Sequence, residues 1–449
     1  MSTVVAIGPN AAERPARRDR LKTLGMLGLL LGTAPLTAAL VAPLWLLSLP
    51  VSRRARAGAR TVLISGGKMT KAGLLARAFH RAGYRVVLAE TERYRLTGHR
   101  FSRAVDAFLT LPKETAPDYA DALRAAIEAH AVDVYVPVCS PAASLADSRA
   151  KPDIATLCRV IHLGPADCAR VDDKHQFSEA ARARGLAAPK SYRITHPQQV
   201  LDHDWSSETR PFIIKSIAYD AIRRLDLTPL PRPTRGETVD FLSRLPISES
   251  NPWVMQEFIA GREFCTHGTV VDGRLTVHIA CESSPFQINY DHVPRDDMRD
   301  WVERFVAGTG MTGQLSFDFI EADDDGRLYA IECNPRTHSA ITLFKGRDGL
   351  AESYLGQADG VLEPTGARPT YWLGHELFRL ATGHGMPRWE RLKTLLRGRD
   401  AVLSVRDPLP FFMLHHVHIP SLLWRELREG RGWHRIDINI GKLVQAGGD

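Results

Sequence analysis

Apolar and polar residues alternate along two short segments of the chain, and this alternation predicts a β-hairpin. The segments are residues 317–320 and 331–334, with three aspartates and a glycine between them at 323–326 as the turn. Side chains two positions apart on a strand point to the same face. We therefore expect Asp318, Glu332 and Asn334 to share one face.

Three oxygen-bearing side chains on one strand face suit a Mg²⁺ ion whose coordination is completed by phosphate oxygens and water. Asp318, Glu332 and Asn334 are accordingly the candidate metal ligands. The alternative is an edge hairpin whose acids simply face solvent, because Asp and Glu are common on exposed strand faces.

Earlier in the chain, short apolar runs alternate with amphipathic helical patterns. This alternation is typical of a parallel α/β layer. The predicted strands are 61–65, 85–89 and 132–138, and the predicted helices lie near 72–82 and 119–130.

Gly66-Gly67-Lys68-Met69, after the first of these strands, resembles a P-loop only superficially. Val62 stands where the first glycine of that motif belongs, and Met69 stands where Ser or Thr would bind Mg²⁺. No dinucleotide fingerprint follows the strand either. The turn still has amides that could bind an anion.

The N-terminal region has a different pattern, because residues 23–52 contain no charged side chain. That length is sufficient to cross a bilayer. Pro35 and Pro43 make a straight helix less certain, so a re-entrant hairpin is an alternative. A cleavable signal peptide fits less well, because basic sequence follows the apolar run and no clear cleavage site is present.

The charge of the chain comes from this same region. Residues 1–60 hold nine Lys or Arg and two Asp or Glu, which accounts for the whole formal net charge of +7. The remaining chain is neutral, so the basic balance indicates a membrane surface and gives no reason to expect nucleic acid. The six cysteines lack C-x-x-C spacing, which argues against zinc and a disulfide framework and fits a reducing compartment.

Five features in sequence order resemble the ATP-grasp superfamily over residues 61–356. They are a lysine opening a helical pattern, a lysine ending a buried strand, a strand leading into a linker, a glutamate after a glycine, and the Asp…Glu-x-Asn-Pro-Arg hairpin. In this chain they correspond to Lys174, Lys215, residues 253–260, Glu263, and Asp318 with residues 332–336.

The resemblance implies a role for each residue. Lys174 and Lys215 would contact the phosphates, Gln256 and the backbone of Glu257, Phe258 and Ile259 would bind adenine, and Glu263 would bind ribose. Asp318, Glu332 and Asn334 would hold Mg²⁺, and Arg336 would face the γ-phosphate or the acceptor oxygen. Taken alone, either lysine is an ordinary surface residue.

Two positions depart from the superfamily pattern. Ser316 stands where D-alanine–D-alanine-type ligases have an arginine, so either Arg336 or Arg223 supplies the cation that steadies an oxyanion, or the intermediate needs less stabilisation. The glycine-rich flap is replaced by residues 216–224, and we expect this segment to close over ATP with Arg223 and Arg224.

Several further segments resemble the mycosporine-glycine synthetase family over nearly the whole chain. They are residues 65–71, 98–102, 133–141, 286–290, 334–341 and 437–443. The resemblance implies that ATP phosphorylates the enolate of 4-deoxygadusol and that glycine then displaces phosphate. Candidate substrate contacts are His338, Ser339, Gln287, Asn289 and Arg224.

The sequence thus predicts an α/β chain with an ATP-grasp fold preceded by a Rossmann-like domain. The expected divisions are a membrane segment (1–60), the Rossmann-like domain (61–165), the ATP-grasp domain (166–360) and a C-terminal extension (361–449). The expected cofactors are ATP and Mg²⁺, and the expected partners are a cyclohexenone, glycine and membrane lipid. The catalytic part is expected in the cytoplasm. The alternatives are a ligase that forms an ordinary amide and a membrane-tethered nucleotide-binding module without turnover.

Overall fold

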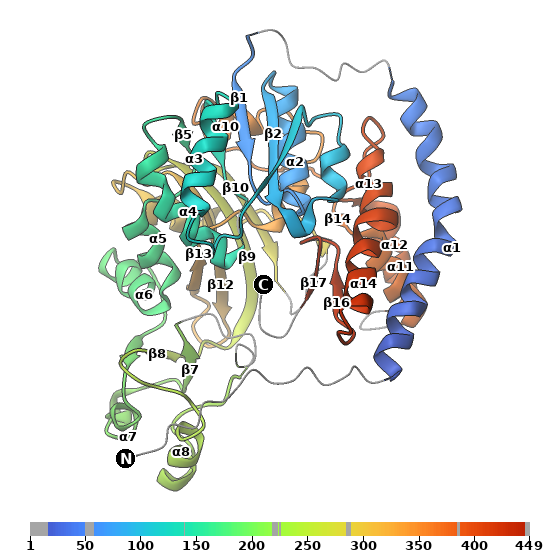
Figure 1. Cartoon of the computed structure of the whole chain (residues 1–449). Helices are drawn as coiled ribbons and strands as arrows, with labels where there is room; N and C mark the ends of the chain where they lie inside the picture. The colour runs from blue at the N-terminus through green and yellow to red at the C-terminus, as the bar shows by residue number, and fades with distance from the viewer. Residues whose placement is uncertain are drawn as a thin grey trace, which may run out of the picture.

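The computed structural model describes residues 17–49, 58–138, 140–217, 223, 226–283, 289–383 and 387–444. Two of the expected site residues, Arg224 and Gln287, lie outside them. Figure 1 shows a long N-terminal helix at one side of a body built from several sheets.

The first sheet is parallel, with strand order β3-β2-β1-β4-β5, as the alternating pattern predicted. Its strands are β1 (Thr61–Ile64), β2 (Arg85–Thr91), β3 (Ala107–Leu111), β4 (Val134–Val136) and β5 (Arg159–Val160). The helices of this region are α2 (Thr70–Arg81), α3 (Tyr119–Ala129), α4 (Pro141–Ile154) and α5 (Pro165–Asp172), with short 3₁₀ turns at Glu92–Tyr94 and Gly98–Phe101.

The turn after β1 does not offer a free anion site. Gly66 has φ +70°, and a Cβ there would lie 2.0 Å from the Val138 carbonyl oxygen, so the turn needs glycine. The backbone amide of Lys68 donates to the Glu90 carboxylate at 2.9 Å. The Glu90 carboxylate therefore occupies the position at which the sequence suggested that an anionic ligand could bind.

The middle of the chain forms two antiparallel sheets. The smaller has order β6-β8-β7, and the larger has order β10-β9-β12-β13. Their strands are β6 (Ser191–Ile194), β7 (Phe212–Ser216), β8 (Trp253–Glu257), β9 (Gly261–Val271), β10 (Arg274–Glu282), β12 (Gly313–Ala322) and β13 (Leu328–Asn334). The helices are α6 (Lys174–Ala183), α7 (Gln198–Leu201), α8 (Arg235–Leu242) and α9 (Asp296–Val306), with 3₁₀ turns at Trp205–Ser207 and Ser339–Phe344.

An aromatic cluster under the larger sheet holds strand β12. Phe317 and Phe319 are fully buried and contact Trp301 of α9, with ring centroids 5.5 and 5.3 Å away. Phe177 of α6 lies 6.0 Å from Phe317. Because side chains alternate along a strand, burying these two phenylalanines turns Asp318 toward the opposite face.

The C-terminal region packs back on the first sheet. It contains α10 (Leu350–Tyr354), α11 (Leu373–Thr382), α12 (Arg388–Arg397), α13 (Leu409–Met413), a π-helix η5 (Leu414–His418) and α14 (Ile419–Arg428). A small sheet joins β11 (Asn289–Tyr290), β14 (Thr370–Tyr371) and β15 (Arg399–Asp400), and β16 (Arg435–Asp437) pairs with β17 (Lys442–Val444).

A buried aspartate, Asp407, fastens this region to the first sheet's layer. It accepts from Arg77 Nε at 2.7 Å, Ser102 Oγ at 2.6 Å and the Arg103 amide at 3.0 Å. Its pKa lies below the ordinary value despite burial, because Arg77 and these donors stabilise the charged form.

The N-terminal helix α1 (Arg17–Leu47) runs continuously through Pro35 and Pro43, so the structure shows one helix and no re-entrant hairpin. Among the described residues it is the one helix long and apolar enough to cross a membrane, judged by length and composition. It lies beside α13, α14 and η5 (Figure 1).

Replacing Phe317 by Ala should lower the free energy of unfolding by about 3–5 kcal/mol, because it removes a buried ring from the cluster. Urea titration followed by tryptophan fluorescence measures the change. Phe378→Ala, at a 65% exposed position, is the matched control and should change stability by less than about 0.5 kcal/mol. Equal urea midpoints for the two variants would contradict this assignment of the core.

Candidate active site

A cleft of about 620 Å³ lies between the two antiparallel sheets. This volume falls within the usual range for a small-molecule or cofactor site. Nine of the ten residues predicted for nucleotide and metal binding line it, namely Lys174, Lys215, Gln256, Glu257, Phe258, Ile259, Glu263, Asp318 and Glu332.

Two carboxylates face each other on the floor of the cleft. Asp318 of β12 lies directly opposite Glu332 of β13 in the antiparallel register. Asn334, the tenth predicted residue, donates from Nδ2 to Glu332 Oε1 at 3.1 Å. The structure thus brings together the three side chains that the hairpin pattern placed on one face.

A lysine compensates part of this negative charge. Lys174 Nζ lies 2.9 Å from Glu332 Oε2. Lys174 opens helix α6 because Asp173 caps it, accepting from the amides of His175 and Gln176 at 2.9 and 3.1 Å.

The two acids respond to this arrangement in opposite directions. Lys174 lowers the pKa of Glu332 in spite of its burial, whereas burial and the facing Glu332 raise the pKa of Asp318 well above its ordinary value. Glu332 in turn raises the pKa of Lys174. Asp318 is therefore the acid that another cation would stabilise most.

The donor set fits a Mg²⁺ ion that also binds phosphate. No group of three or more His, Cys, Asp or Glu side chains could hold a metal ion in the described part of the chain. The protein would contribute the two carboxylates and the Asn334 amide oxygen, and phosphate oxygens and water would complete the coordination. Mg²⁺ is commonly bound in this way.

Lys215 enters the cleft from the smaller sheet. Its Nζ donates to the carbonyl oxygen of Asp226 at 2.8 Å, and burial lowers its pKa. Arg223, expected to act on the phosphates, lies in the loop before Asp226 and is not among the residues lining the cleft.

The strand that leads out of the smaller sheet forms the inner end of the cleft. Gln256 is buried, and its Nε2 donates to the carbonyl oxygen of Ile331 at 3.1 Å. This bond joins β8 to β13. The side chain of Glu257 accepts from the Lys190 amide at 3.0 Å, and the Glu257 amide donates to the Lys190 carbonyl oxygen at 2.8 Å.

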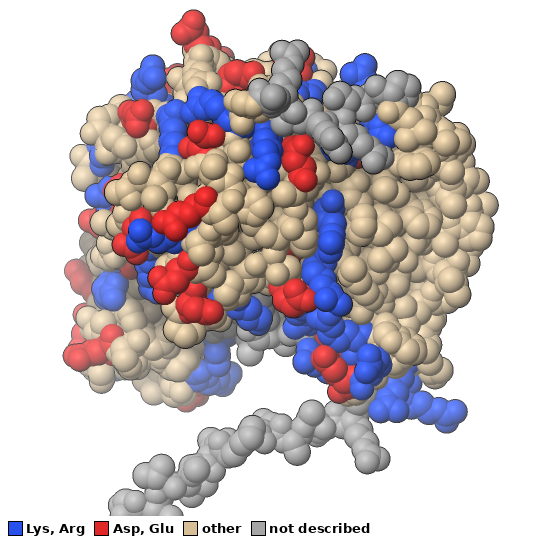
Figure 2. All heavy atoms as spheres, turned by 45° about the horizontal axis from the view of Figure 1, so that its top comes forward, with Lys and Arg blue, Asp and Glu red and all other residues tan. Residues whose placement is uncertain are grey.

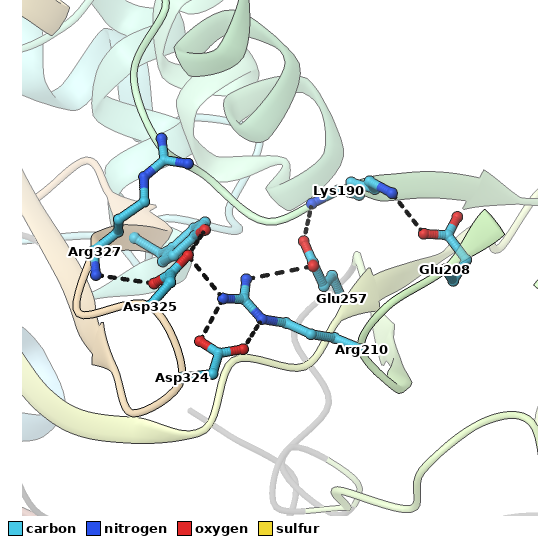
Figure 3. A network of polar contacts seen from close by, with 8 residues as sticks. Lys190, Glu208, Arg210, Glu257, Asp324, Asp325 and Arg327 are labelled. Atoms are coloured by element: carbon cyan, nitrogen blue, oxygen red, sulfur yellow. Dashed lines mark hydrogen bonds and ion pairs between the residues drawn. The ribbon is translucent and has the colours of Figure 1, made fainter.

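An arginine that the sequence analysis missed links the two sheets at this point (Figure 3). Arg210 binds Asp324 through two hydrogen bonds of 2.7 and 2.6 Å and contacts Asp325 and Glu257 at 3.0 and 3.4 Å. Its guanidinium also lies over the Tyr329 ring, 4.8 Å from the centroid. The turn at 323–326 and the end of β8 are thereby held together.

Apolar residues of the cleft wall were also missed, namely Ile213, Leu227 and Ile331. One of them could have been found from strand alternation, because Ile213 lies two residues before Lys215 and shares its face. No comparable signal marked Arg210.

The segment after Asn334 passes between the larger sheet and the first sheet's layer. Ser144 Oγ donates to the Pro335 carbonyl oxygen at 2.6 Å, and Lys71 Nζ donates to the Thr337 carbonyl oxygen. Arg336, in this segment, is partly buried.

Predicted substrate residues gather at the end of this segment. The rings of His338 and Tyr290 meet edge to face at 5.4 Å, and Ser339 Oγ accepts from Asn439 Nδ2 at 2.8 Å. Burial lowers the pKa of His338 to about 3, so its imidazole is neutral at physiological pH. Asn289 precedes Tyr290 in strand β11.

Ser316, which stands where some ligases have an arginine, lies in strand β12 of the larger sheet. It is buried, and its hydroxyl donates to the Thr266 carbonyl oxygen at 2.8 Å. The position that carries a catalytic arginine in some ligases therefore has a structural role in this chain.

Comparison with known proteins shows the fold but no close relative. No family model and no curated protein matches the sequence. Among solved structures, biotin carboxylase from Campylobacter jejuni in complex with β-γ-ATP aligns with TM-score 0.53 and 13% identity, covering 66% of this chain and 70% of that one.

Two further structures give similar agreement. N5-carboxyaminoimidazole synthetase from Staphylococcus aureus aligns with TM-score 0.53 and 14% identity over 73% of this chain and 86% of its own. The biotin carboxylase domain of Hydrogenobacter thermophilus 2-oxoglutarate carboxylase, in complex with MgADP, ADP and bicarbonate, aligns with TM-score 0.50 and 14% identity over 68% and 70%. The prediction of fold is confirmed: the chain has an ATP-grasp fold preceded by a Rossmann-like layer.

Proposed function

We propose that this chain is an ATP-dependent ligase that joins glycine to 4-deoxygadusol, releasing ADP and phosphate. The observation that carries the general activity is the cleft between the two antiparallel sheets, where lysines and carboxylates meet. The specific substrates rest on the sequence resemblance at residues 65–71, 334–341 and 437–443.

ATP would lie along the cleft, from the end of β8 to the β12–β13 hairpin. Gln256 and the backbone of residues 257–259 would bind adenine, and Glu263 at the start of β9 would accept from the ribose hydroxyls. Lys174 and Lys215 would contact the phosphates as compact charges. A Mg²⁺ ion on Asp318, Glu332 and Asn334 would neutralise charge on the phosphates during transfer.

The acceptor chemistry suits this arrangement. The enolate of a cyclic 1,3-diketone spreads its charge over two oxygens, as a carboxylate does. One enolate oxygen attacks the γ-phosphorus, its bond to phosphorus forms as ADP leaves, and a vinylogous acyl phosphate results. The neutral amine of glycine then attacks the ring carbon, the carbon–oxygen bond to phosphate breaks, and an enaminone remains after loss of a proton. The protein contributes positioning and charge stabilisation.

The acceptor would bind near the segment that follows Asn334. His338, neutral because burial lowers its pKa, would exchange hydrogen bonds with ring hydroxyls, together with Ser339 and Asn289. Arg336 would supply the positive charge that Ser316 cannot, and Arg223 remains the second candidate for this charge.

Phosphate release should require 4-deoxygadusol and glycine together, because the amine is needed to displace phosphate from the intermediate. The measurement is a continuous phosphate assay with both substrates, each alone, and simple carboxylates with glycine. Mass spectrometry of the product confirms the enaminone.

Each other outcome of this assay has a definite meaning. Turnover only with a simple carboxylate would replace the proposal by an ordinary amide ligase. Nucleotide binding without turnover on any acceptor would favour a binding module.

Asp318→Asn and Glu332→Gln should each lower turnover by at least about tenfold and raise the Mg²⁺ concentration needed for half-maximal activity, because each removes a charged ligand. Steady-state rates across a Mg²⁺ titration measure both effects. Asp323→Asn, in the exposed turn of the same hairpin, is the matched control and should leave the Mg²⁺ dependence unchanged. An unchanged Mg²⁺ requirement in both site variants would refute the metal assignment.

Nucleotide affinity should fall with rising pH, beginning below the range in which an ordinary lysine loses its proton. Burial lowers the pKa of Lys215, whereas bound phosphate favours its charged form, so above that pKa binding must take up a proton. The nucleotide affinity should fall by at most about tenfold for each pH unit. Titration of a fluorescent ATP analogue between pH 7 and 10 measures it.

Lys215→Arg should remove this dependence, because a guanidinium stays charged throughout. Lys190→Arg is the control, since Lys190 pairs with Glu208 at 2.7 Å and its pKa is raised. A Lys215→Arg protein with the same pH slope as the parent would reject the role of Lys215.

A further inference from the structure

Helix α1 contacts the body near its start, near its middle and directly after its end. The Asp19 carboxylate lies beside Gly432, the Leu30 carbonyl oxygen accepts from His416 Nδ1 at 2.9 Å, and the Ser48 carbonyl oxygen accepts from Arg103. A helix of this length measures about 46 Å. If α1 crossed a bilayer with these contacts intact, the attached body would have to enter the membrane too. The contacts therefore favour a helix lying in the plane of the membrane surface.

The face of α1 that points away from the body is apolar. Leu31 and Leu36 are 77% and 73% exposed, and further exposed leucines are Leu21, Leu24, Leu29, Leu40, Leu46 and Leu47. Figure 2 shows a broad surface without Lys, Arg, Asp or Glu on this side of the molecule, with Lys and Arg gathered at one end. The four bases at the start of α1 are Arg17, Arg18, Arg20 and Lys22.

The pair α11–α12 has the reverse of the usual helix pattern, with apolar side chains outward and a polar pair inward. Arg391 and Glu376 are buried and form an ion pair at 3.4 Å between the two helices. In a helix on the surface of a water-soluble domain the apolar stripe normally faces the core.

The outward face of α12 combines apolar residues with cations. Trp389, Leu392 and Leu396 recur at helical spacing and are 56%, 49% and 70% exposed. The exposed bases beside this stripe are Arg388, Lys393 and Arg397. Lys393 Nζ lies 3.5 Å from the centre of the Trp389 ring. On α11, Leu377 and Phe378 are likewise exposed. Trp, Phe and Leu bordered by Lys and Arg are typical of helices that bind at a lipid–water interface.

Both helical elements flank the same π-helix. His416 of η5 binds the carbonyl oxygen of Leu30 in α1, whereas the neighbouring His415 lies beside Gly374 of α11. Figure 1 shows α11 and α12 on the side of the body where α1 lies. Helix α1 and the α11–α12 pair therefore lie on the same side of the body, next to η5.

We propose that α1 and the α11–α12 pair form one membrane-binding face that lies on a bilayer containing anionic lipid. The apolar side chains enter the headgroup region, and the bases of α1 and α12 pair with lipid phosphates, which matches the charge of the surface. The N-terminal helix is then part of an interfacial membrane-binding surface and does not span the membrane. The proposal is independent of the reaction catalysed in the cleft.

The test uses an environment-sensitive fluorophore on a cysteine introduced at Leu392 in the full chain, with the parent chain carried through the same labelling as blank. The protein is added to vesicles of phosphatidylcholine with 30% phosphatidylglycerol. We expect a blue shift at position 392 and quenching by brominated lipid. Val239→Cys on α8, 44% exposed, is the control position and should show neither.

A second measurement tests the contribution to affinity. Leu392→Asp/Leu396→Asp should weaken vesicle partitioning at least tenfold in a flotation assay, because the favourable transfer of two exposed leucine side chains from water into lipid is lost. Leu157→Asp/Val239→Asp, at exposed positions away from this face, should partition like the parent. Vesicles of phosphatidylcholine alone should bind the parent more weakly than the anionic vesicles.

Two results would overturn the proposal. One is a label at Leu392 that stays in water while α1 holds the protein on the vesicles, which would mean that α1 spans the bilayer alone. The other is a lipid-free dimer that Leu392→Asp/Leu396→Asp dissociates, which would make a second copy of the chain the occupant of this face.

Discussion

Two acids on neighbouring strands, Asp318 and Glu332, face each other across the β12–β13 ladder. The placement of the charged residues around the cleft depends on this pair. Like charges in such positions destabilise a sheet unless cations compensate them. Lys174 compensates Glu332, and Asp318 is left with a raised pKa. A divalent cation beside Asp318 would relieve this imbalance of charge, which supports the proposed Mg²⁺ site.

The rest of the central region keeps these two acids in register. Phe317 and Phe319 anchor β12 from below through Trp301, while Arg210 ties the turn of the hairpin to the end of β8. Gln256 adds a second link through Ile331. Both faces of the cleft are therefore connected at its inner end, although they belong to different sheets.

Much of this could be predicted from the sequence because the signals are local. Alternation along one strand predicts the position of Asp318, and the run ending at Lys215 predicts β7. The missing parts depend on contacts between distant segments. Arg210 is an ordinary surface arginine until the turn at 323–326 folds against it. The expectation that residues 216–224 close over ATP stays a prediction, because most of this segment lies outside the described residues.

The C-terminal region illustrates the same limit. Ile436, Ile438 and Ile440 alternate with polar residues as in a strand, yet β16 ends at Asp437 and a turn follows. That turn packs against the start of the chain's first sheet layer, where Asn439 accepts from the Thr70 amide at 2.9 Å and Gly441 passes too close to Lys68 for any side chain.

This closure has a consequence for synthesis on the ribosome. Three residues from later in the chain contact the layer built from residues 61–160. Trp372 donates to the Thr70 hydroxyl, Asp407 accepts from Arg77, and Gly441 lies against Lys68. These partners emerge hundreds of residues after the strands they cover. This layer is translated early but is therefore among the last parts to be fully covered, and its apolar surface stays exposed to the cell until translation is nearly complete.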